Sequence, residues 1–168
     1  VTFTITFSPT VVGSYLAIVT ILNNDTDESI YDFVIQGNCI VTGREIDVQG
    51  NDTSIPDGDI TPTTIDLTDF GTTYVGLPIT IPFQVYSLGT NTLRVTSVAI
   101  TGGSGFTSTN LANVDIASGG VASFVVTFTP TATGTFTATV TVNNDSNVTG
   151  GKNVYTFRVT AQVVAMPT

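Results

Sequence analysis

Residues 128–145 read Phe-Thr-Pro-Thr-Ala-Thr-Gly-Thr-Phe-Thr-Ala-Thr-Val-Thr-Val-Asn-Asn-Asp. From Gly134 to Val142 the apolar residues alternate with threonines at a period of two. This period is that of a β-strand with one face in a core and the other in water. Residues 155–163 alternate in the same way. The pattern predicts neighbouring strands of an antiparallel sheet that forms one layer of a sandwich.

The same block occurs a second time, near the start of the chain. Residues 7–25 read Phe-Ser-Pro-Thr-Val-Val-Gly-Ser-Tyr-Leu-Ala-Ile-Val-Thr-Ile-Leu-Asn-Asn-Asp, and both copies continue to a Tyr-X-Phe segment, at Tyr31 and at Tyr155. The matches keep their order at an offset of about 120 to 124 residues, which shared composition alone does not produce. The chain therefore contains an internal repeat.

Composition and charge narrow the fold class and the function classes. Charged residues make up only 10% of the chain, and threonine and valine are abundant, which favours strands over helices. There is no histidine, so Ser-His-Asp triads, Cys-His dyads and histidine-containing zinc sites are excluded. The net charge of −9 repels nucleic acid and anionic membrane surfaces, so we expect no nucleic-acid partner. No apolar run is long enough for membrane insertion.

We expect an all-β fold: an immunoglobulin-like antiparallel β-sandwich in tandem repeat. Residues 45–165 are predicted to form a complete module, residues 40–44 a junction, and residues 166–168 a tail or a link to the next module. Residues 1–39 are predicted to be the C-terminal strands of a preceding module. The expected strands of the complete module lie at residues 45–49, around Ile65 and Leu67, and at residues 79–85, 93–101, 121–129, 134–144 and 153–164.

The predicted half module at residues 1–39 has three alternating segments, the first of which carries Phe3, Ile5 and Phe7. A sheet of three strands with one uncovered apolar face is not stable alone in water. We therefore expect them to pair with neighbouring modules of the same chain, from sequence upstream, or with another subunit. The single cysteine, Cys39, is expected to be a small buried hydrophobe.

The repeated motifs resemble a known family. The motifs are Phe-X-Pro-X-X-X-Gly, then Ala-X-Val-Thr followed by Asn-Asn-Asp, then Tyr-X-Phe, together with Glu45-Ile-Asp-Val-Gln-Gly-Asn and Asp66-Leu-Thr-Asp-Phe-Gly71. They look like the Hydin-like or ASH immunoglobulin-like modules of bacterial "choice-of-anchor D" surface proteins, common among type IX-secreting Bacteroidota. The resemblance covers nearly the whole chain. It implies an extracellular or cell-surface location and a stalk or adhesin role, and it carries no catalytic motif.

Eleven of the 13 acidic residues lie between residues 25 and 69. Oxygen-rich loops of this kind supply the hard ligands that calcium prefers. The candidate ligands of a structural calcium ion are Asp25, Asp27, Glu28, Asp57 and Asp59. The alternative is that these are ordinary solvated turns, because Asn, Asp, Gly and Pro are the residues that turns require. No other cofactor is expected.

We expect no enzymatic activity, because the chain has no tryptophan and its phenylalanines fall on the alternating core faces. The leading hypothesis is a structural or adhesive module of a large extracellular bacterial surface protein, as a stalk, filament or gliding-type adhesin. The alternative is a carbohydrate- or ligand-binding accessory module of a secreted multidomain protein that contacts surface glycans. Tyr74 and Tyr86 are the aromatic candidates for that site, against ordinary sheet packing.

Overall fold

The computed structural model describes residues 2–109, 111–148 and 152–167. The chain divides into two compact units, Val1–Val41 (unit 1) and Thr42–Thr168 (unit 2), and each is described by itself. The division falls inside the predicted junction at residues 40–44.

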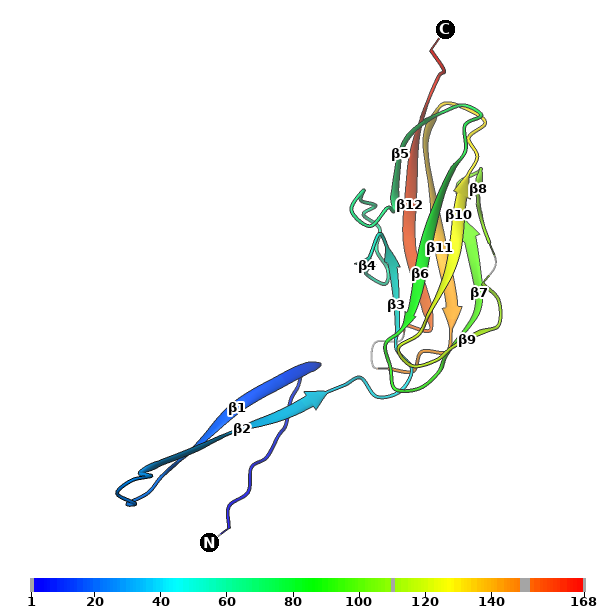
Figure 1. Cartoon of the computed structure of the whole chain (residues 1–168). Helices are drawn as coiled ribbons and strands as arrows, with labels where there is room; N and C mark the ends of the chain where they lie inside the picture. The colour runs from blue at the N-terminus through cyan, green and yellow to red at the C-terminus, as the bar shows by residue number, and fades with distance from the viewer. Residues whose placement is uncertain (1, 110, 149–151, 168) are drawn as a thin grey trace. The chain divides into compact units, whose positions relative to one another are not determined.

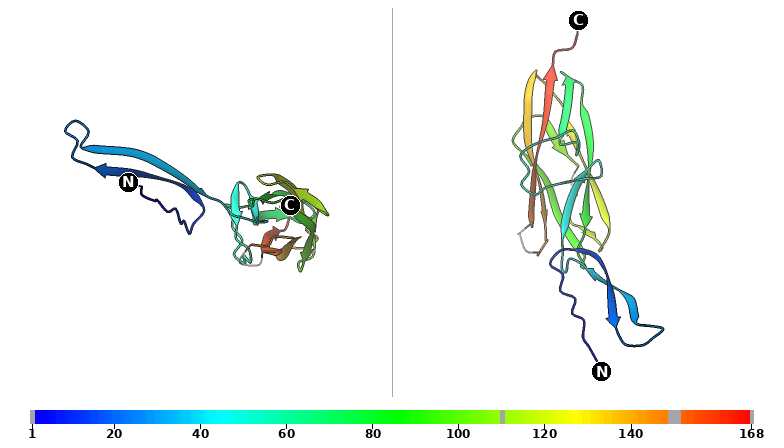
Figure 2. Two further views of the ribbon diagram at one scale, coloured as in Figure 1. Left: turned by 90° about the horizontal axis from the view of Figure 1, so that it is seen from below. Right: turned by 90° about the vertical axis from the view of Figure 1, so that its left-hand side faces the viewer.

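Unit 2 is a sandwich of two five-stranded sheets, which are layered face to face in Figure 2. The first sheet has the order β4-β3-β6-β10-β8 and the second the order β5-β12-β11-β7-β9. The strands of the first sheet are β3 (Ile46–Gly50), β4 (Thr53–Ile55), β6 (Ile79–Ser87), β8 (Phe106–Ser108) and β10 (Val121–Phe128). Those of the second are β5 (Asp69–Tyr74), β7 (Leu93–Thr101), β9 (Val114–Ile116), β11 (Gly134–Asn144) and β12 (Val154–Val164).

The core of unit 2 lies between these sheets and is built from the inward residues of the alternating strands. The Phe83 ring lies 5.6 Å from the Phe124 ring and 5.3 Å from the Phe157 ring, measured between centroids, which joins the two layers. All strand pairs in unit 2 are antiparallel except β12 with β5, which is parallel. The predicted all-β immunoglobulin-like sandwich is confirmed.

The chain enters and leaves unit 2 at opposite ends of the sandwich. Ile46, the first residue of β3, pairs with Ser87 at the end of β6. The β6 strand starts at the other end, beside the β5–β6 turn, where the Val75 N–H donates to the Val164 carbonyl of β12. In Figure 1, β3 begins at one of these ends and β12 runs to the other.

The expected strand around Ile65 and Leu67 is wrong, because these residues lie in a turn and the strand begins later, at Asp69. Leu67 has a φ of 60°, which is incompatible with an extended strand. The buried Asp66 carboxylate causes the turn by accepting hydrogen bonds from the Thr68 N–H at 3.1 Å and the Thr68 hydroxyl at 2.6 Å. Strand propensity of two aliphatic residues is overridden by this local side-chain bonding.

Unit 1 contains two antiparallel strands, β1 (Gly13–Leu22) and β2 (Ile30–Cys39), which pair along their full length. The segment with Phe3, Ile5 and Phe7 is not a strand, contrary to the prediction. Its counterpart in unit 2 is β10, which pairs with β6 and β8 rather than with its own following hairpin. Residues 2–8 stay outside a ladder because the described residues of unit 1 include no counterparts of β6 and β8.

In the part of the chain that the structure describes, no helix is long and apolar enough to cross a membrane.

Candidate interaction surface

The β1–β2 hairpin of unit 1 and the β11–β12 hairpin of unit 2 have the same register. The offset is about 121 residues in the first strand and about 124 in the second, and it holds at every pair. The equivalent core-facing pairs are Gly13–Cys39 and Gly134–Val163, Tyr15–Gly37 and Phe136–Ala161, Ala17–Ile35 and Ala138–Val159, Val19–Phe33 and Val140–Phe157, and Ile21–Tyr31 and Val142–Tyr155. The two hairpins are structural copies of one another.

The same face is buried in unit 2 and open in unit 1. Phe157 and Tyr155 are 1% and 2% exposed, while their counterparts Phe33 and Tyr31 are 36% and 55% exposed. Cys39 is half-buried, whereas its counterpart Val163 is buried, so the expectation of a buried cysteine is not met. We call this open face, which carries the core-facing residues of β1 and β2, the inner face. Its exposure comes from the absence of an opposing layer in unit 1.

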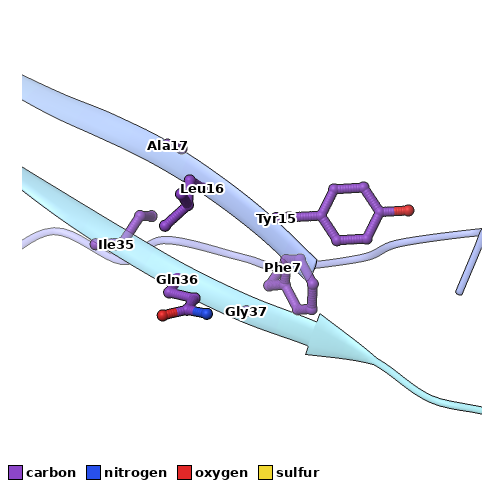
Figure 3. A pocket seen from close by; sticks show the side chains of 7 residues that line it. All are labelled: Phe7, Tyr15, Leu16, Ala17, Ile35, Gln36 and Gly37. Carbon is purple, nitrogen blue, oxygen red and sulfur yellow. The ribbon is translucent and has the colours of Figure 1, made fainter. Parts of the chain in front are cut away.

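One contact of the missing layer is present, as Figure 3 shows. The Phe7 ring lies against Gly37, where an added Cβ would come within 2.8 Å of the ring, and it contacts Tyr15 edge-on with centroids 5.7 Å apart. The equivalent rings in unit 2, Phe128 and Phe136, lie 5.4 Å apart. Beside Phe7 the inner face leaves an open apolar hollow of about 130 Å³. Residues 2–8 therefore approach the place of β10 only at their C-terminal end.

Both edges of the hairpin are also unpaired within the described part of unit 1. In unit 2, β11 pairs with β7 on its second edge and β12 pairs with β5 on its second edge. In unit 1, β1 and β2 pair only with each other. A two-stranded hairpin with free edges is marginally stable in water and is a template for further strands.

The outer face of this hairpin differs in chemistry from that of unit 2. Leu16, Ile18 and Val34 stand where unit 2 has Thr137, Thr139 and Arg158, and all three are exposed. The repeat therefore preserves the inner residues more closely than the outer ones.

The hairpin loops share an asparagine with one role. In unit 1, Asn23 Oδ1 accepts from the Asp25 N–H at 2.7 Å and Asn23 Nδ2 donates to the Glu28 carbonyl at 2.7 Å. In unit 2, Asn144 Oδ1 accepts from the Ser146 N–H at 2.8 Å and Asn144 Nδ2 donates to a carbonyl at 2.9 Å. The structure thus makes Asn23 equivalent to Asn144. Alignment of the two Asn-Asn-Asp motifs would instead pair Asn23 with Asn143, one residue earlier.

Of the first calcium candidates, Asp25, Asp27 and Glu28 all lie in this exposed loop. Hydrogen bonding with the Asp27 side chain, followed by the Asp27 backbone, lowers the pKa of Asp25 below its ordinary value. Asp25 Oδ1 accepts a hydrogen bond from the Asp27 N–H at 3.4 Å, so this carboxylate stabilises the turn of the loop. Within the described ranges no three acidic, cysteine or histidine side chains gather as a metal site.

The other two calcium candidates also act within the fold. Asp57 Oδ1 accepts from the Thr156 N–H of β12 at 2.8 Å, and Asp59 Oδ1 accepts from the N–H of Thr61 at 2.9 Å and its hydroxyl at 2.6 Å. Both belong to unit 2, while Asp25, Asp27 and Glu28 belong to unit 1. Calcium binding by either group of acids stays a prediction.

Tyr74 and Tyr86 do not form one aromatic platform. Tyr74 pairs with Val164 at the far end of the second sheet, whereas Tyr86 pairs with Asp47 and Val121 near the opposite end of the first sheet. The Tyr86 hydroxyl donates to Gln84 Oε1 at 2.9 Å, so its ring extends along β6. Gln84, the partner of Tyr86, lines a groove of about 250 Å³ on the outer surface of the first sheet, and Tyr86 is not itself among the lining residues.

Sequence reasoning missed a cluster that holds the first residues of unit 2. Asn147 Oδ1 accepts from the Arg44 N–H at 2.8 Å, the Asn147 N–H donates to the Arg44 carbonyl at 3.1 Å, and the Ser146 hydroxyl donates to the same carbonyl at 2.9 Å. The Arg44 guanidinium pairs with Asp145 at 3.2 Å, and Lys152 pairs with Glu45. The entering chain is fixed by backbone bonding to the β11–β12 loop, and no composition signal marks such bonds.

No protein-family model and no curated protein matches this sequence. Among solved structures, the chain is similar to an ASH/PapD-like domain of human CEP192, with a TM-score of 0.51 and 11% identity over 74% of this chain and 89% of that one. It is also similar to a protein of unknown function from Porphyromonas gingivalis W83, with a TM-score of 0.51 and 10% identity over 91% of this chain and 67% of that one.

A third likeness is to a family 123 glycoside hydrolase from Clostridium perfringens, with a TM-score of 0.52 and 10% identity over 73% of this chain and 28% of that one. At such low identities these similarities are evidence of a shared fold and not of a shared function. The chain has an immunoglobulin-like β-sandwich fold.

Proposed function

We propose that the chain is a non-enzymatic structural or adhesive segment of a large extracellular protein, built of tandem immunoglobulin-like modules at a bacterial surface. The observation that carries this proposal is the presence of two structurally equivalent terminal hairpins in one chain. A repeated module is the unit of stalks and filaments, in which each module contributes length. The resemblance to choice-of-anchor D proteins supports the bacterial surface location.

The geometry of unit 2 supports a mechanical role. The chain enters at one end of the sandwich and leaves at the other, so the module adds its long dimension to a stalk. β11 and β12 have 11 residues each, about 37 Å of strand at 3.4 Å per residue. The entering segment around Arg44 is bonded to the β11–β12 loop, so force that reaches unit 2 acts on the folded sheets.

Pulling on unit 2 in a force spectrometer tests this proposal. We expect one unfolding step with a contour-length gain of about 40 nm, because about 120 residues extend at roughly 3.4 Å each. Labelling of intact cells with an antibody against unit 2 tests the location. Unfolding in several small steps at low force, or a signal only after cell lysis, would contradict the proposal.

A second candidate function, glycan binding, is favoured by the outer surface around Tyr86. The lining of the groove beside Gln84 includes Gln49, Gln84 and Ser123, which share one row across β3, β6 and β10, and Tyr86 adjoins it through its bond to Gln84. The other lining residues of the groove are Asn51, Asp52, Leu67 and Pro82. Amides and hydroxyls beside an aromatic ring are the groups that contact neutral sugars.

A glycan array of neutral oligosaccharides tests this second candidate. Binding that is lost in Tyr86→Ser and kept in Tyr74→Ser would support a sugar site on the first sheet. The Tyr74 variant is a matched control, because it removes a similarly half-buried tyrosine from the other sheet. Equal binding by both variants, or none by the unchanged protein, would remove the candidate.

A further inference from the structure

We infer that the inner face of the β1–β2 hairpin is the docking surface for strands of the preceding part of the same chain, which close unit 1 into a second sandwich. The inference rests on the proposed tandem architecture and specifies how the open unit is completed. Its occupant is the segment immediately before residue 1, with the strand pattern of β3 to β9.

The exposed residues define what the occupant must supply. In unit 2 the inner face of β11 and β12 is covered by the aromatic side chains Phe83, Phe124 and Phe128 and by the valines of β3, β6 and β10. Because the β1–β2 hairpin has the register of the β11–β12 hairpin, the sheet that covers it must also present an apolar face. An apolar β-sheet layer fits this surface, because the exposed inner side chains are aromatic and aliphatic.

The positions of the missing strands follow from the pairing in unit 2. β1 takes the place of β11, so its free edge accepts an antiparallel strand like β7. β2 takes the place of β12, so its free edge accepts a parallel strand like β5. Residues 2–8 take the place of β10, between strands like β6 and β8. Phe3 is 60% exposed and its counterpart Phe124 is 1% exposed, and this closure would bury Phe3.

Two observations favour the preceding chain over a second copy as occupant. Residues 2–8 already hold part of the opposing layer, because the Phe7 ring covers Gly37, and a second hairpin would have to displace it. In unit 2 the partners of β10, which are β6 and β8, also precede it in sequence. Residues 117–120 turn the chain from β9 into β10, where the Gly120 N–H donates to the Ala117 carbonyl. About 75 residues separate the starts of β3 and β10, which sets the length required.

Cys39 provides a probe of this closure, because it is the only cysteine of the chain and lies on the inner face. The experiment compares residues 1–168 with the natural chain extended upstream by about one module, and it measures the rate at which the thiol reacts with 5,5′-dithiobis(2-nitrobenzoate). We expect a rate at least about tenfold lower in the extended chain, since protection follows burial. Cysteines of the added segment are changed to serine, and Cys39→Ser gives the background.

Two variants of the extended chain test which face is covered. Phe33→Arg should restore the thiol reactivity at least about tenfold, because its counterpart Phe157 lies in the core. Val34→Arg is the matched control, since unit 2 has Arg158 at that outward position. We expect the Val34 variant to stay protected.

Three outcomes would overturn the inference. The first is equal thiol reactivity in the short and extended chains. The second is equal reactivity of the two arginine variants. The third is protection in residues 1–168 alone that rises with concentration and coincides with a doubled mass by light scattering, which would make a second copy the occupant. None of these results alters the force experiment on unit 2, so the two proposals fail separately.

Discussion

Phe157→Ala is expected to destabilise unit 2 strongly, whereas the equivalent change Phe33→Ala is expected to leave unit 2 unaffected. The Phe157 side chain is 1% exposed on β12 and its ring centroid lies 5.3 Å from that of Phe83 on the opposing sheet. Removing a buried phenylalanine ring lowers the free energy of unfolding by about 3–5 kcal/mol, through lost transfer energy and a cavity. The total free energy of unfolding of a domain of this size is about 5–15 kcal/mol, so the loss is a large share of it.

The matched change is informative because the two residues are equivalent in register. Phe33 is paired with Val19 as Phe157 is paired with Val140, but Phe33 is 36% exposed and faces no opposing sheet within the described part of unit 1. Little contact is therefore lost at Phe33, and unit 2 keeps its full core. In the upstream-extended chain the Phe33 change should become as damaging as the Phe157 change, because the ring would then lie in a core.

Urea unfolding followed by circular dichroism measures both effects in residues 1–168. We expect the midpoint of the unit 2 transition to fall for Phe157→Ala and to stay constant for Phe33→Ala, with Phe157→Leu as a milder variant if the alanine protein does not fold. A loss below about 1.5 kcal/mol at Phe157 would refute the core assignment, since that value suits a half-exposed ring. A comparable loss of unit 2 stability at Phe33 would refute the separation of the units.

Four further results are expected. Asn144→Ala should lower the stability of unit 2 by about 2 kcal/mol in urea unfolding, because it leaves buried loop groups unsatisfied, while the exposed Asn23→Ala should leave the unit 2 transition unchanged. Burial, and then the Asp47 charge, raises the pKa of Tyr155 above its ordinary value. The free energy of unfolding of unit 2 should therefore be constant below about pH 10 and fall at higher pH, where the tyrosine ionises in the unfolded chain but not in the folded one. Tyr155→Phe should flatten this alkaline loss of stability in urea unfolding at several pH values. Chelation with EDTA should leave the melting temperature unchanged, and a clear drop would instead support structural calcium at the predicted acids. Replacing Leu16 and Ile18 by threonine, as in unit 2, should reduce the binding of an apolar dye without lowering the stability of unit 2.

The alternating segments were predictable because their period matches the strand period over long runs. Strands β7 and β11 begin and end where the pattern predicts, and β3, β6, β10 and β12 differ by a residue or two. The short strands β4, β8 and β9 have three residues each, too few for a period to appear. β5 was misplaced, because Asp66 bonds to its own backbone neighbours and delays the strand.

The open inner face of unit 1 was predictable in outline. The repeat matches residues 1–39 only to the last strands of a module, so their sheet was expected to lack its opposing layer. The sequence could not indicate that residues 2–8 leave the ladder, because strand formation there depends on partner strands that are far away in sequence. The placement of the two aromatic candidates on different sheets was unpredictable for a similar reason. Tyr74 and Tyr86 are 12 positions apart, but β5 and β6 belong to different sheets, which separates them across the sandwich.

The acidic loops illustrate how the repeat changes the interpretation of a motif. Both copies contain Asn-Asn-Asp, yet register and hydrogen bonding align Asn23 with Asn144, so the repeated aspartates are not equivalent positions. Asp145 pairs with Arg44 and accepts from the Arg94 N–H at 2.8 Å, which fixes the entry of the chain into its own module. What the two copies share is the asparagine that shapes the hairpin loop, and this role needs no cation. The repeat therefore favours a structural origin for the loop over a metal site, and the chelation experiment decides between them.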